Sequence, residues 1–319
     1  MTSRPDGPSA APEWAPEREI TEEAAAALVG ERFPELRGAA VERLATGWDN
    51  TVLLVAGEFA FRFPRRGIAV PGVRREIAAL PLLAPRVPLP VPVPRFVGEP
   101  SPSFPWPFWG ARLLPGRELA DVRPPDGDRV RLGGETGAFL RALHDPALAA
   151  EAERALPPGA LPVDPLRRAD PARRAAMAAE RLDRLAAAGT WARDPAVERF
   201  LAAARGWSAP QGRPVVCHGD LHVRHLLLDG GGRAAGVIDW GDVCLADPAV
   251  DLSLAYAGFA GDGRAALLAA YGPVPPDGVR AARVLAVFIC AALAEYAAST
   301  GRDGLLDEAL AGVGRVLAP

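Results

Sequence analysis

Proline is the residue that most constrains how this chain can fold, because 34 prolines occur in 319 residues and they are densest between residues 84 and 107. A proline fixes φ and has no backbone N–H, so such a segment cannot form the interior of a helix and allows only edge strands or extended connections. We expect two short strands there, in PRFVG (94–98) and PFWGARLL (107–114). After this segment comes the junction Pro115-Gly116, which divides a shorter first part of the chain from a longer second part.

The first part has the pattern of a small antiparallel sheet. Its apolar segments are interrupted by Gly47 and Gly57, as in successive hairpins. Thr21, followed by two glutamates and an alanine-rich stretch, is typical of a helix N-terminus. The expected strands are VERLAT (41–46), NTVLLVAG (50–57) and EFAFRFP (58–64), and the expected helices cover 21–30 and 72–83.

The second part is helical almost to its end, with one interruption. Three short apolar segments form that interruption, and the glycine-rich turn 229–233 joins the last two as a hairpin. These segments are VVCH (215–218), HLLLD (225–229) and GVIDW (236–240). We therefore predict an α+β chain, with a flexible tail over 1–19, a sheet-containing N-terminal lobe over 20–114 and a helical C-terminal lobe over 115–319.

Composition limits the classes of function. The net charge is −3 and all 36 basic residues are arginine, so there is no charge excess for nucleic-acid binding. Three widely spaced cysteines indicate a reducing compartment rather than a disulfide framework, and we expect a cytoplasmic location. The N-terminus lacks the apolar run of a signal peptide. The most apolar segment, 284–293, is shorter than a membrane span, so it is expected to be a buried core helix and no membrane partner is predicted.

Polar side chains gather around the predicted hairpin, where the apolar strands end. Carboxylates that follow two buried strands directly are expected to converge at one edge of a sheet, held rigidly enough to bind Mg²⁺ or to accept a proton. These residues are His218, Asp220, His222 and His225 after the first strand, and Asp239 and Asp242 after the last.

The segment HGDLHVRH followed by VIDWGD resembles the aminoglycoside and macrolide phosphotransferases, which share a bilobal protein-kinase-like fold and usually carry HGDxxxxN followed by IDxxx. The resemblance implies that Asp220 is the catalytic carboxylate, which orients the acceptor hydroxyl and takes its proton. It implies that Asp239 binds Mg²⁺. His225 stands where the family usually has asparagine, as in the subgroup of 2''-aminoglycoside and macrolide kinases, several of which accept GTP. Histidine is a poorer Mg²⁺ ligand than an amide oxygen.

The first part carries a second set of matching residues. Arg62 alternates with two phenylalanines, so its side chain points to the face opposite theirs. By the resemblance, Arg62 replaces the lysine that binds nucleotide phosphates, and Glu76 orients this cation; an arginine can form such a pair with two hydrogen bonds. The resemblance also implies that the turn Gly47, Asp49, Asn50 and Thr51 covers the phosphates, and that backbone groups from Arg112 to Leu114 hold the base.

Plainer interpretations exist for several of these residues. Asp220 and Asp239 are also compatible with carboxylates that cap turns. Arg62 and Glu76 are compatible with an ordinary surface ion pair. His218 is expected to be structural. His222 is compatible with an exposed loop residue and Arg224 with a solvated cation. Cys217 is compatible with an inert buried thiol. Asp247 and Asp251 are compatible with caps of a helix that begins near Pro248.

The acceptor is not readable from the sequence. Glu295, Asp303, Asp307 and Glu308 are compatible with an acidic cleft for a polycationic aminoglycoside and equally with a solvated helix face.

The sequence leads to one main hypothesis and three others. We predict a small-molecule O-phosphotransferase that moves the γ-phosphate of GTP or ATP, with Mg²⁺, to a hydroxyl of an aminoglycoside, macrolide or nucleoside antibiotic and so confers resistance. It is expected to act as a monomer or homodimer. The alternatives are a kinase of a small metabolite, a transition-metal hydrolase using the histidine and aspartate cluster, and a kinase-shaped protein that binds nucleotide without turnover.

Overall fold

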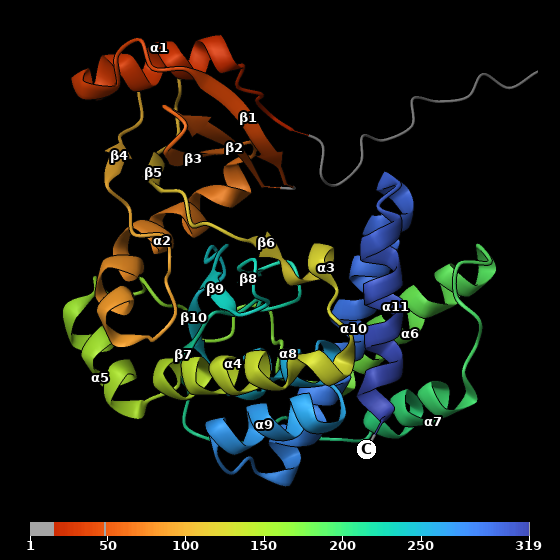
Figure 1. The fold of residues 1–319 in the computed structure, drawn as a ribbon. Helices are drawn as coiled ribbons and strands as arrows, with labels where there is room; N and C mark the ends of the chain where they lie inside the picture. Colours follow the sequence, from red (N-terminus) through yellow and green to blue (C-terminus); the bar gives the residue numbers. More distant parts are fainter. Residues whose placement is uncertain (1–15, 48, 319) are drawn as a thin grey trace, which may run out of the picture. The chain divides into compact units, whose positions relative to one another are not determined.

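The computed structural model describes residues 16–47 and 49–318. Residues 1–15, which make up most of the predicted tail, and Trp48, in the predicted phosphate-binding turn, lie outside the described residues. Contacts divide the chain into two compact units, the first reaching to Ile77 and including Val93–Leu113, the second formed by Ala78–Pro92 and the residues from Leu114 onward. Figure 1 labels their elements.

The first unit contains a five-stranded antiparallel sheet in the order β1-β2-β3-β5-β4. Its strands are β1 (Val41–Thr46), β2 (Asn50–Val55), β3 (Phe59–Pro64), β4 (Phe96–Gly98) and β5 (Phe108–Arg112). Helix α1 (Glu22–Arg32) precedes the sheet, and the Thr21 hydroxyl caps it by accepting from the Ala24 N–H at 3.1 Å. The predicted antiparallel sheet and opening helix are confirmed.

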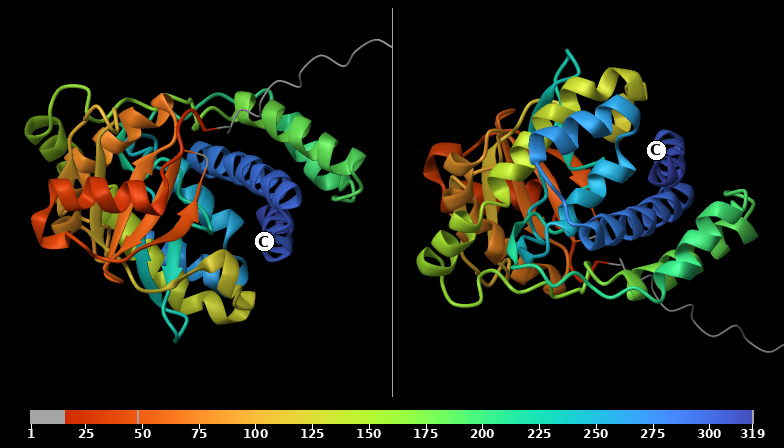
Figure 2. Two further views of the ribbon diagram at one scale, coloured as in Figure 1. Left: turned by 90° about the horizontal axis from the view of Figure 1, so that it is seen from above. Right: turned by 90° about the horizontal axis from the view of Figure 1, so that it is seen from below.

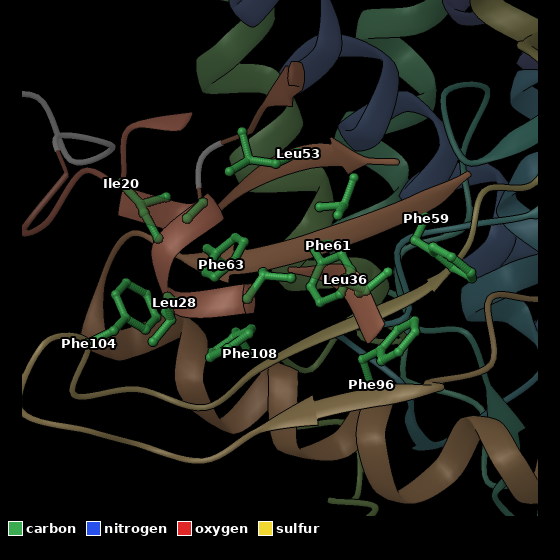
Figure 3. Packing of buried hydrophobic residues seen from close by; sticks show 13 residues of the cluster. Ile20, Leu28, Leu36, Leu53, Phe59, Phe61, Phe63, Phe96, Phe104 and Phe108 are labelled. Atoms are coloured by element: carbon green, nitrogen blue, oxygen red, sulfur yellow. The ribbon is translucent and has the colours of Figure 1, made fainter. Parts of the chain in front are cut away.

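Aromatic side chains form the core of the first unit (Figure 3). Along β3 the buried Phe61 and Phe63 alternate with Arg62, as the period of a strand requires. Phe63 stacks on Phe108 with ring centroids 4.7 Å apart. Gly110 faces Phe61 from β5, and a Cβ there would lie 2.6 Å from the Phe61 ring, so the close packing of these strands requires glycine.

Helix α2 (Val70–Leu83) follows the sheet hairpins and carries Glu76. It begins two residues before the predicted start of this helix. Its first two turns belong to the first unit, whereas the residues from Ala78 onward belong to the second.

The second unit is mainly helical, which confirms the predicted α+β class. Helix α10 packs against α6, α8 and α11, and Figure 2 shows α10 and α11 side by side in blue. Helix α4 packs closely on α9, because a Cβ on Gly133 would lie 2.2 Å from the Gly263 carbonyl oxygen. The helices are α3 (Leu119–Val122), α4 (Val130–Leu143), α5 (Pro146–Ala155), α6 (Pro171–Ala187), α7 (Pro195–Ala204), α8 (Ala249–Ala257), α9 (Gly261–Tyr271), α10 (Pro276–Thr300) and α11 (Asp303–Leu317).

Two small sheets interrupt these helices. β7 (Val215–Cys217) pairs with β10 (Cys244–Ala246), and β8 (Leu226–Leu228) lies between β6 (Arg117–Glu118) and β9 (Ala234–Val237). The predicted β8–β9 hairpin is confirmed, and Asp229 N–H donates to the Arg233 carbonyl at its turn. The expectation of one sheet edge for both carboxylates was wrong. The strands before Asp220 and Asp239 belong to different sheets, because β10, which the sequence did not reveal, takes the place beside β7.

Helix α10 is long and apolar enough, by length and composition alone, to cross a membrane. In the described part of the chain it is the only helix with this property, and 67% of its most apolar window is buried. Burial of this extent is typical of the core helix of a globular domain.

Candidate active site

The loop after β7 is shaped by a glycine. Gly219 has a φ of +89°, and a Cβ at this position would lie 2.1 Å from the Asp242 carbonyl oxygen. Only glycine allows both this conformation and this close approach. The loop that carries Asp220 is therefore pressed against the turn that carries Asp242.

Asp251 of α8 anchors the same loop. Its carboxylate accepts from the backbone N–H groups of His218 at 2.7 Å and Gly219 at 3.0 Å, and it lies 3.2 Å from Nε2 of His144. Burial alone would raise the pKa of Asp251, but the His144 and backbone hydrogen bonds outweigh it and the pKa is lowered. The expectation that Asp251 caps a helix was wrong, whereas Asp247 does cap α8, accepting from the Ala249 N–H at 2.9 Å.

His218 is held on both sides of its ring. Nε2 lies 3.0 Å from the Ile238 carbonyl oxygen, so it donates, and Nδ1 accepts from the Asp220 N–H at 3.2 Å. Burial lowers the pKa of His218, which favours the neutral ring that these two bonds require. Both nitrogens are used by the backbone, which agrees with a structural role.

His225 contacts the backbone of one candidate aspartate and lies near the carboxylate of the other. Its Nδ1 lies 2.8 Å from the Asp220 backbone carbonyl oxygen and must carry the proton, while its Nε2 lies 3.5 Å from Oδ2 of Asp239. Asp239 itself has a φ of +67°, a strained conformation for a residue with a side chain. The two aspartates thus approach the same imidazole from the two sheets.

His222 is packed beside this imidazole. The rings of His222 and His225 stack with centroids 3.8 Å apart, and His222 Nε2 lies 3.6 Å from Oδ2 of Asp220. Burial lowers the pKa of His222 well below its usual value. The interpretation of His222 as an exposed loop residue was wrong, since its exposure is 8%.

Arg168, in the segment before α6, is a site residue that the sequence analysis missed. Its guanidinium lies 3.4 Å from Oδ1 of Asp220 and 3.0 Å from Oδ2 of Asp242. Burial alone would lower the pKa of Arg168, but the two carboxylates outweigh it and the pKa is raised. No pattern marks this residue, because its partners lie far along the chain.

The segment that presents Arg168 is irregular and strained. Asp164 and Arg167 both have positive φ values, +25° and +51°. The Asp164 carboxylate accepts from the Arg168 and Ala169 N–H groups, at 2.7 and 3.1 Å, and so fixes the turn. Strain of this kind persists where the surroundings over-determine a conformation, as at functional sites.

Arg224 of the same loop is paired, so its interpretation as a solvated cation was wrong. Its guanidinium binds both oxygens of Glu118, at 3.1 and 3.3 Å, and lies over the Tyr296 ring. Glu118 also contacts Arg302 at 3.4 Å. This cluster ties the loop to β6 and to the end of α10.

In the first unit, Arg62 and Glu76 lie together as a buried pair. Arg62 Nε is 3.4 Å from Oε2 of Glu76, and the Trp109 indole N–H donates to that oxygen at 3.1 Å. The exposed fractions of the two side chains are 12% and 1%, which excludes the surface ion pair. The role of the pair in nucleotide binding stays a prediction.

The turn between β1 and β2 is closed by a hydrogen bond from the Gly47 N–H to the Asn50 carbonyl oxygen at 2.9 Å. Two arginines after β3 support it, which the sequence did not reveal. Arg65 donates to the Gly47 carbonyl oxygen at 2.8 Å, and Arg66 binds the Asp49 carboxylate. Thr51 is buried in β2. The role of this turn over the phosphates stays a prediction.

At the predicted hinge, the Leu113 N–H donates to the Glu58 carbonyl oxygen at 2.8 Å. Hydrogen-bonded and non-hydrogen-bonded pairs alternate along an antiparallel ladder. Because Leu113 and Glu58 form a hydrogen-bonded pair, the next pair, Arg112 and Phe59, is not bonded, and the backbone groups of Arg112 face away from β3. The Arg112 side chain is exposed and pairs with Glu58. Leu114 belongs to the second unit.

The acidic residues proposed for a cleft are mostly neutralised. Glu295 binds Arg181 and Arg184, and Asp307 binds Arg123 at 3.0 Å. Glu308 is buried between two arginines, Arg129 and Arg315. The interpretation as a solvated face fails for Glu308, and these contacts leave little free negative charge there.

Within the described residues, two clusters have the donor atoms for a metal ion. One consists of Asp220, His222 and His225; the other, of His144, Cys217 and Asp251, is fully buried. In the second, burial raises the pKa of the Cys217 thiol well above its usual value, as expected for an inert thiol.

Residues 40–284 match the model of the phosphotransferase enzyme family. Among solved structures, the chain is similar to the GDP complex of aminoglycoside 2'-phosphotransferase-IIIa, with a TM-score of 0.65 and 22% identity over 93% of this chain and 98% of that one. It is also similar to macrolide 2'-phosphotransferase MphH from Brachybacterium faecium, with a TM-score of 0.58 and 25% identity over 91% and 98%.

The uncharacterized protein YcbJ of Bacillus subtilis (strain 168) is 51% identical over 37 residues, so the match spans only 12% of each chain. The whole-chain structural likenesses confirm the fold that the sequence resemblance implied.

Proposed function

We propose that this chain, which belongs to the phosphotransferase enzyme family, moves the γ-phosphate of GTP or ATP to a hydroxyl of a small antibiotic-like acceptor in the cytoplasm. One observation carries the proposal. His225 contacts the backbone of Asp220 at 2.8 Å and lies 3.5 Å from the carboxylate of Asp239, so the two acids of the motif meet around one side chain.

Asp220 is the proposed catalytic carboxylate. It accepts the proton of the acceptor hydroxyl while that oxygen bonds to the γ-phosphorus and the bond to the β–γ bridging oxygen breaks. Arg168 holds one oxygen of this carboxylate and Asp251 fixes the backbone before it. In such a transfer most of the catalysis comes from positioning and from stabilising charge, which these contacts supply.

The residues around His225 fit a divalent cation. Because Nδ1 of His225 carries the proton, Nε2 turns its lone pair toward the Asp239 carboxylate. Both groups are acceptors, and a cation between them would stabilise this arrangement. Asp239 and His225 would hold Mg²⁺, which supplies charge neutralisation on the nucleotide phosphates when bound.

The first unit contributes nucleotide binding. Arg62, oriented by the buried Glu76, provides the cation for the phosphates, and the turn of Gly47, Asp49, Asn50 and Thr51 lies over them. The backbone of Arg112, which faces away from β3, and that of Leu114 hold the base.

The charge of the second unit favours an acceptor with few positive charges. Because Glu295, Asp307 and Glu308 are paired with arginines, a polycationic aminoglycoside gains little attraction from them. Among the acceptors of similar enzymes, a macrolide suits this surface better.

Two variants test the catalytic assignment. We expect Asp220→Ala to abolish transfer while nucleotide still binds, and Asp239→Ala to remove the Mg²⁺-dependent part of nucleotide binding as well, both measured by coupled kinetics and calorimetry. Normal turnover in either variant would contradict the roles. The wild-type screen uses a macrolide, an aminoglycoside, a nucleoside antibiotic and amino-alcohol or sugar metabolites with GTP and ATP.

The same screen separates the alternatives. A metabolite kinase would turn over only the metabolites, and a binding protein would hold nucleotide without product. A transition-metal hydrolase would need zinc or iron and would lose activity under a chelator in the presence of Mg²⁺.

A further inference from the structure

We infer that Asp220, His222 and His225 form a binding site for a divalent transition-metal ion of the Zn²⁺ class, distinct in chemistry from Mg²⁺, and that an ion bound there blocks phosphate transfer. The metal site stands on the geometry of the second unit alone. Its effect on transfer rests on the proposed function.

The donor atoms of Asp220, His222 and His225 lie close enough together to share one ion. Bonds of about 2.0–2.1 Å to nitrogen and oxygen place neighbouring ligands about 3.3–3.4 Å apart at the corners of a tetrahedron. His222 Nε2 lies 3.6 Å from Oδ2 of Asp220, and His225 Nε2 lies 3.5 Å from Oδ2 of Asp239. Donor atoms of Asp220 and the two histidines all lie within 4.8 Å of one another. The separation of His222 from Asp220 is too long for a good hydrogen bond and close to one edge of such a tetrahedron.

The tautomer of His225 is already the one that a metal needs. Its Nδ1–H donates to the Asp220 carbonyl oxygen at 2.8 Å, which leaves the Nε2 lone pair for the ion. A backbone carbonyl in this position is the usual support of a metal-binding histidine, and it fixes the orientation of the ring.

His222 requires a small adjustment. Its Nδ1 accepts from the Arg224 N–H at a long 3.3 Å, so in the free protein the proton is on Nε2. Metal binding at Nε2 moves this proton to Nδ1 and breaks the weak hydrogen bond from the Arg224 N–H, with no net proton released. His222 is therefore the ligand that costs most to recruit.

The donor set selects against Mg²⁺ for this arrangement. Two imidazole nitrogens and one carboxylate oxygen, with water as a fourth ligand, suit Zn²⁺ or Co²⁺, whereas Mg²⁺ prefers six hard oxygen donors. The two rings are buried and stacked, while the side chains of Asp220 and Asp239 are 32% and 45% exposed, which leaves the ion a path from solvent.

The other cluster does not compete. The Asp251 carboxylate already accepts from two backbone N–H groups, His144 bonds it and the Tyr271 hydroxyl, and Cys217 is fully buried with a raised pKa. Its ligand atoms are used to hold the fold.

An ion at the proposed site would occupy the Asp220 carboxylate. The acceptor hydroxyl would then lose the group that orients it and takes its proton, so transfer would stop even with nucleotide bound.

The test uses the full-length, metal-free chain and Co²⁺, which absorbs strongly in the visible range when four-coordinate. We expect a visible band that saturates at one Co²⁺ per chain, that Zn²⁺ abolishes and that millimolar Mg²⁺ leaves in place. His222→Gln and His225→Asn should each weaken Co²⁺ binding by about 100-fold or more, since loss of a supporting partner alone costs 10–100-fold.

Asp303→Asn, on an acid of α11 outside the site, is the matched control and should bind Co²⁺ as the wild type does. Thermal unfolding checks that each variant folds, and Asp220→Asn replaces any histidine variant that does not. A six-coordinate spectrum, a near-ultraviolet thiolate-to-cobalt band from Cys217, or unchanged binding in the site variants would each overturn the metal site.

The inhibitory effect is measured separately, as the ratio of transfer rates with and without buffered free Zn²⁺ at saturating Mg²⁺. A large fall in the wild type that is reduced in His222→Gln supports the block, and a ratio near one despite bound Zn²⁺ overturns it. If no acceptor is phosphorylated, the proposed function fails, whereas the cobalt spectrum still decides the metal site.

Discussion

Each unit holds an arginine against carboxylates, but the two arrangements are built differently. Arg62 and Glu76 are presented by a regular strand and a regular helix, and their pair is buried against Trp109. Arg168 is presented by an irregular segment with two left-handed residues and reaches Asp220 and Asp242 from there. A pair held by regular elements is expected to matter for stability, whereas one held by a strained segment is expected to matter mainly for function.

Removing one partner of the regular pair should have the largest effect. In Glu76→Ala, the buried guanidinium of Arg62 and the indole N–H of Trp109 lose the carboxylate that both contact. Breaking a buried pair in this way costs about 3–5 kcal/mol of unfolding free energy. Urea unfolding measures the loss.

The matched control is Glu58→Ala, whose partner Arg112 is 70% exposed. An exposed pair contributes about 0–1 kcal/mol, so this variant should unfold nearly as the wild type does. Equal losses in the two variants would mean that burial does not distinguish the pairs.

The irregular pair should affect rate more than stability. In Arg168→Ala the Asp220 carboxylate loses the contact that orients it, and misplacement of a catalytic group by about 1 Å costs about 100-fold in rate. We expect kcat to fall by about that factor while the affinity for nucleotide stays unchanged. Because a single guanidinium nitrogen, Nη2, contacts both carboxylates, Arg168→Lys should recover part of the rate through its ammonium group.

Arg167→Ala is the neighbouring control, since Arg167 is 68% exposed and pairs only with Asp170 among the contacts that the described residues show. Its kcat should match the wild type. A similar fall in both variants, or a fall in Arg168→Ala that follows its loss of thermal stability, would assign Arg168 to the fold rather than to the reaction.

The same difference explains what the sequence could predict. The first unit follows from local patterns: the alternation of Phe61, Arg62 and Phe63 gives the two faces of β3, and Thr21 marks the start of α1. In the second unit the β8–β9 hairpin also follows from a local turn. These features depend on neighbours in the sequence.

The supports of the candidate site depend on distant residues. Asp251 binds backbone groups 32 and 33 positions away, and Arg168 reaches carboxylates 52 and 74 positions away. No periodicity or motif encodes such contacts, because they exist only once the helices have packed. β10 was missed for the same reason, since its three residues form a strand only beside β7.

The last expected effect concerns pH, and it separates the two units directly. All four histidines lie in the second unit. Burial lowers the folded-state pKa of His218 and of His222, so below about pH 6.5 the unfolded chain takes up protons that the folded chain does not. The free energy of unfolding should therefore keep its full value above that pH. It should fall on acidification by up to about 1.4 kcal/mol per pH unit for each histidine.

Hydrogen exchange between pH 7 and 5, corrected for the intrinsic rate, measures this effect by region. Amides of β7 should lose protection as the pH falls, whereas amides of β3 should lose less, because the first unit has no histidine to protonate. His222→Asn should reduce the slope for β7 and leave that for β3 unchanged. Equal slopes in the two strands would show that the units unfold together, and a slope unaffected by the substitution would show that His222 is not the group that titrates.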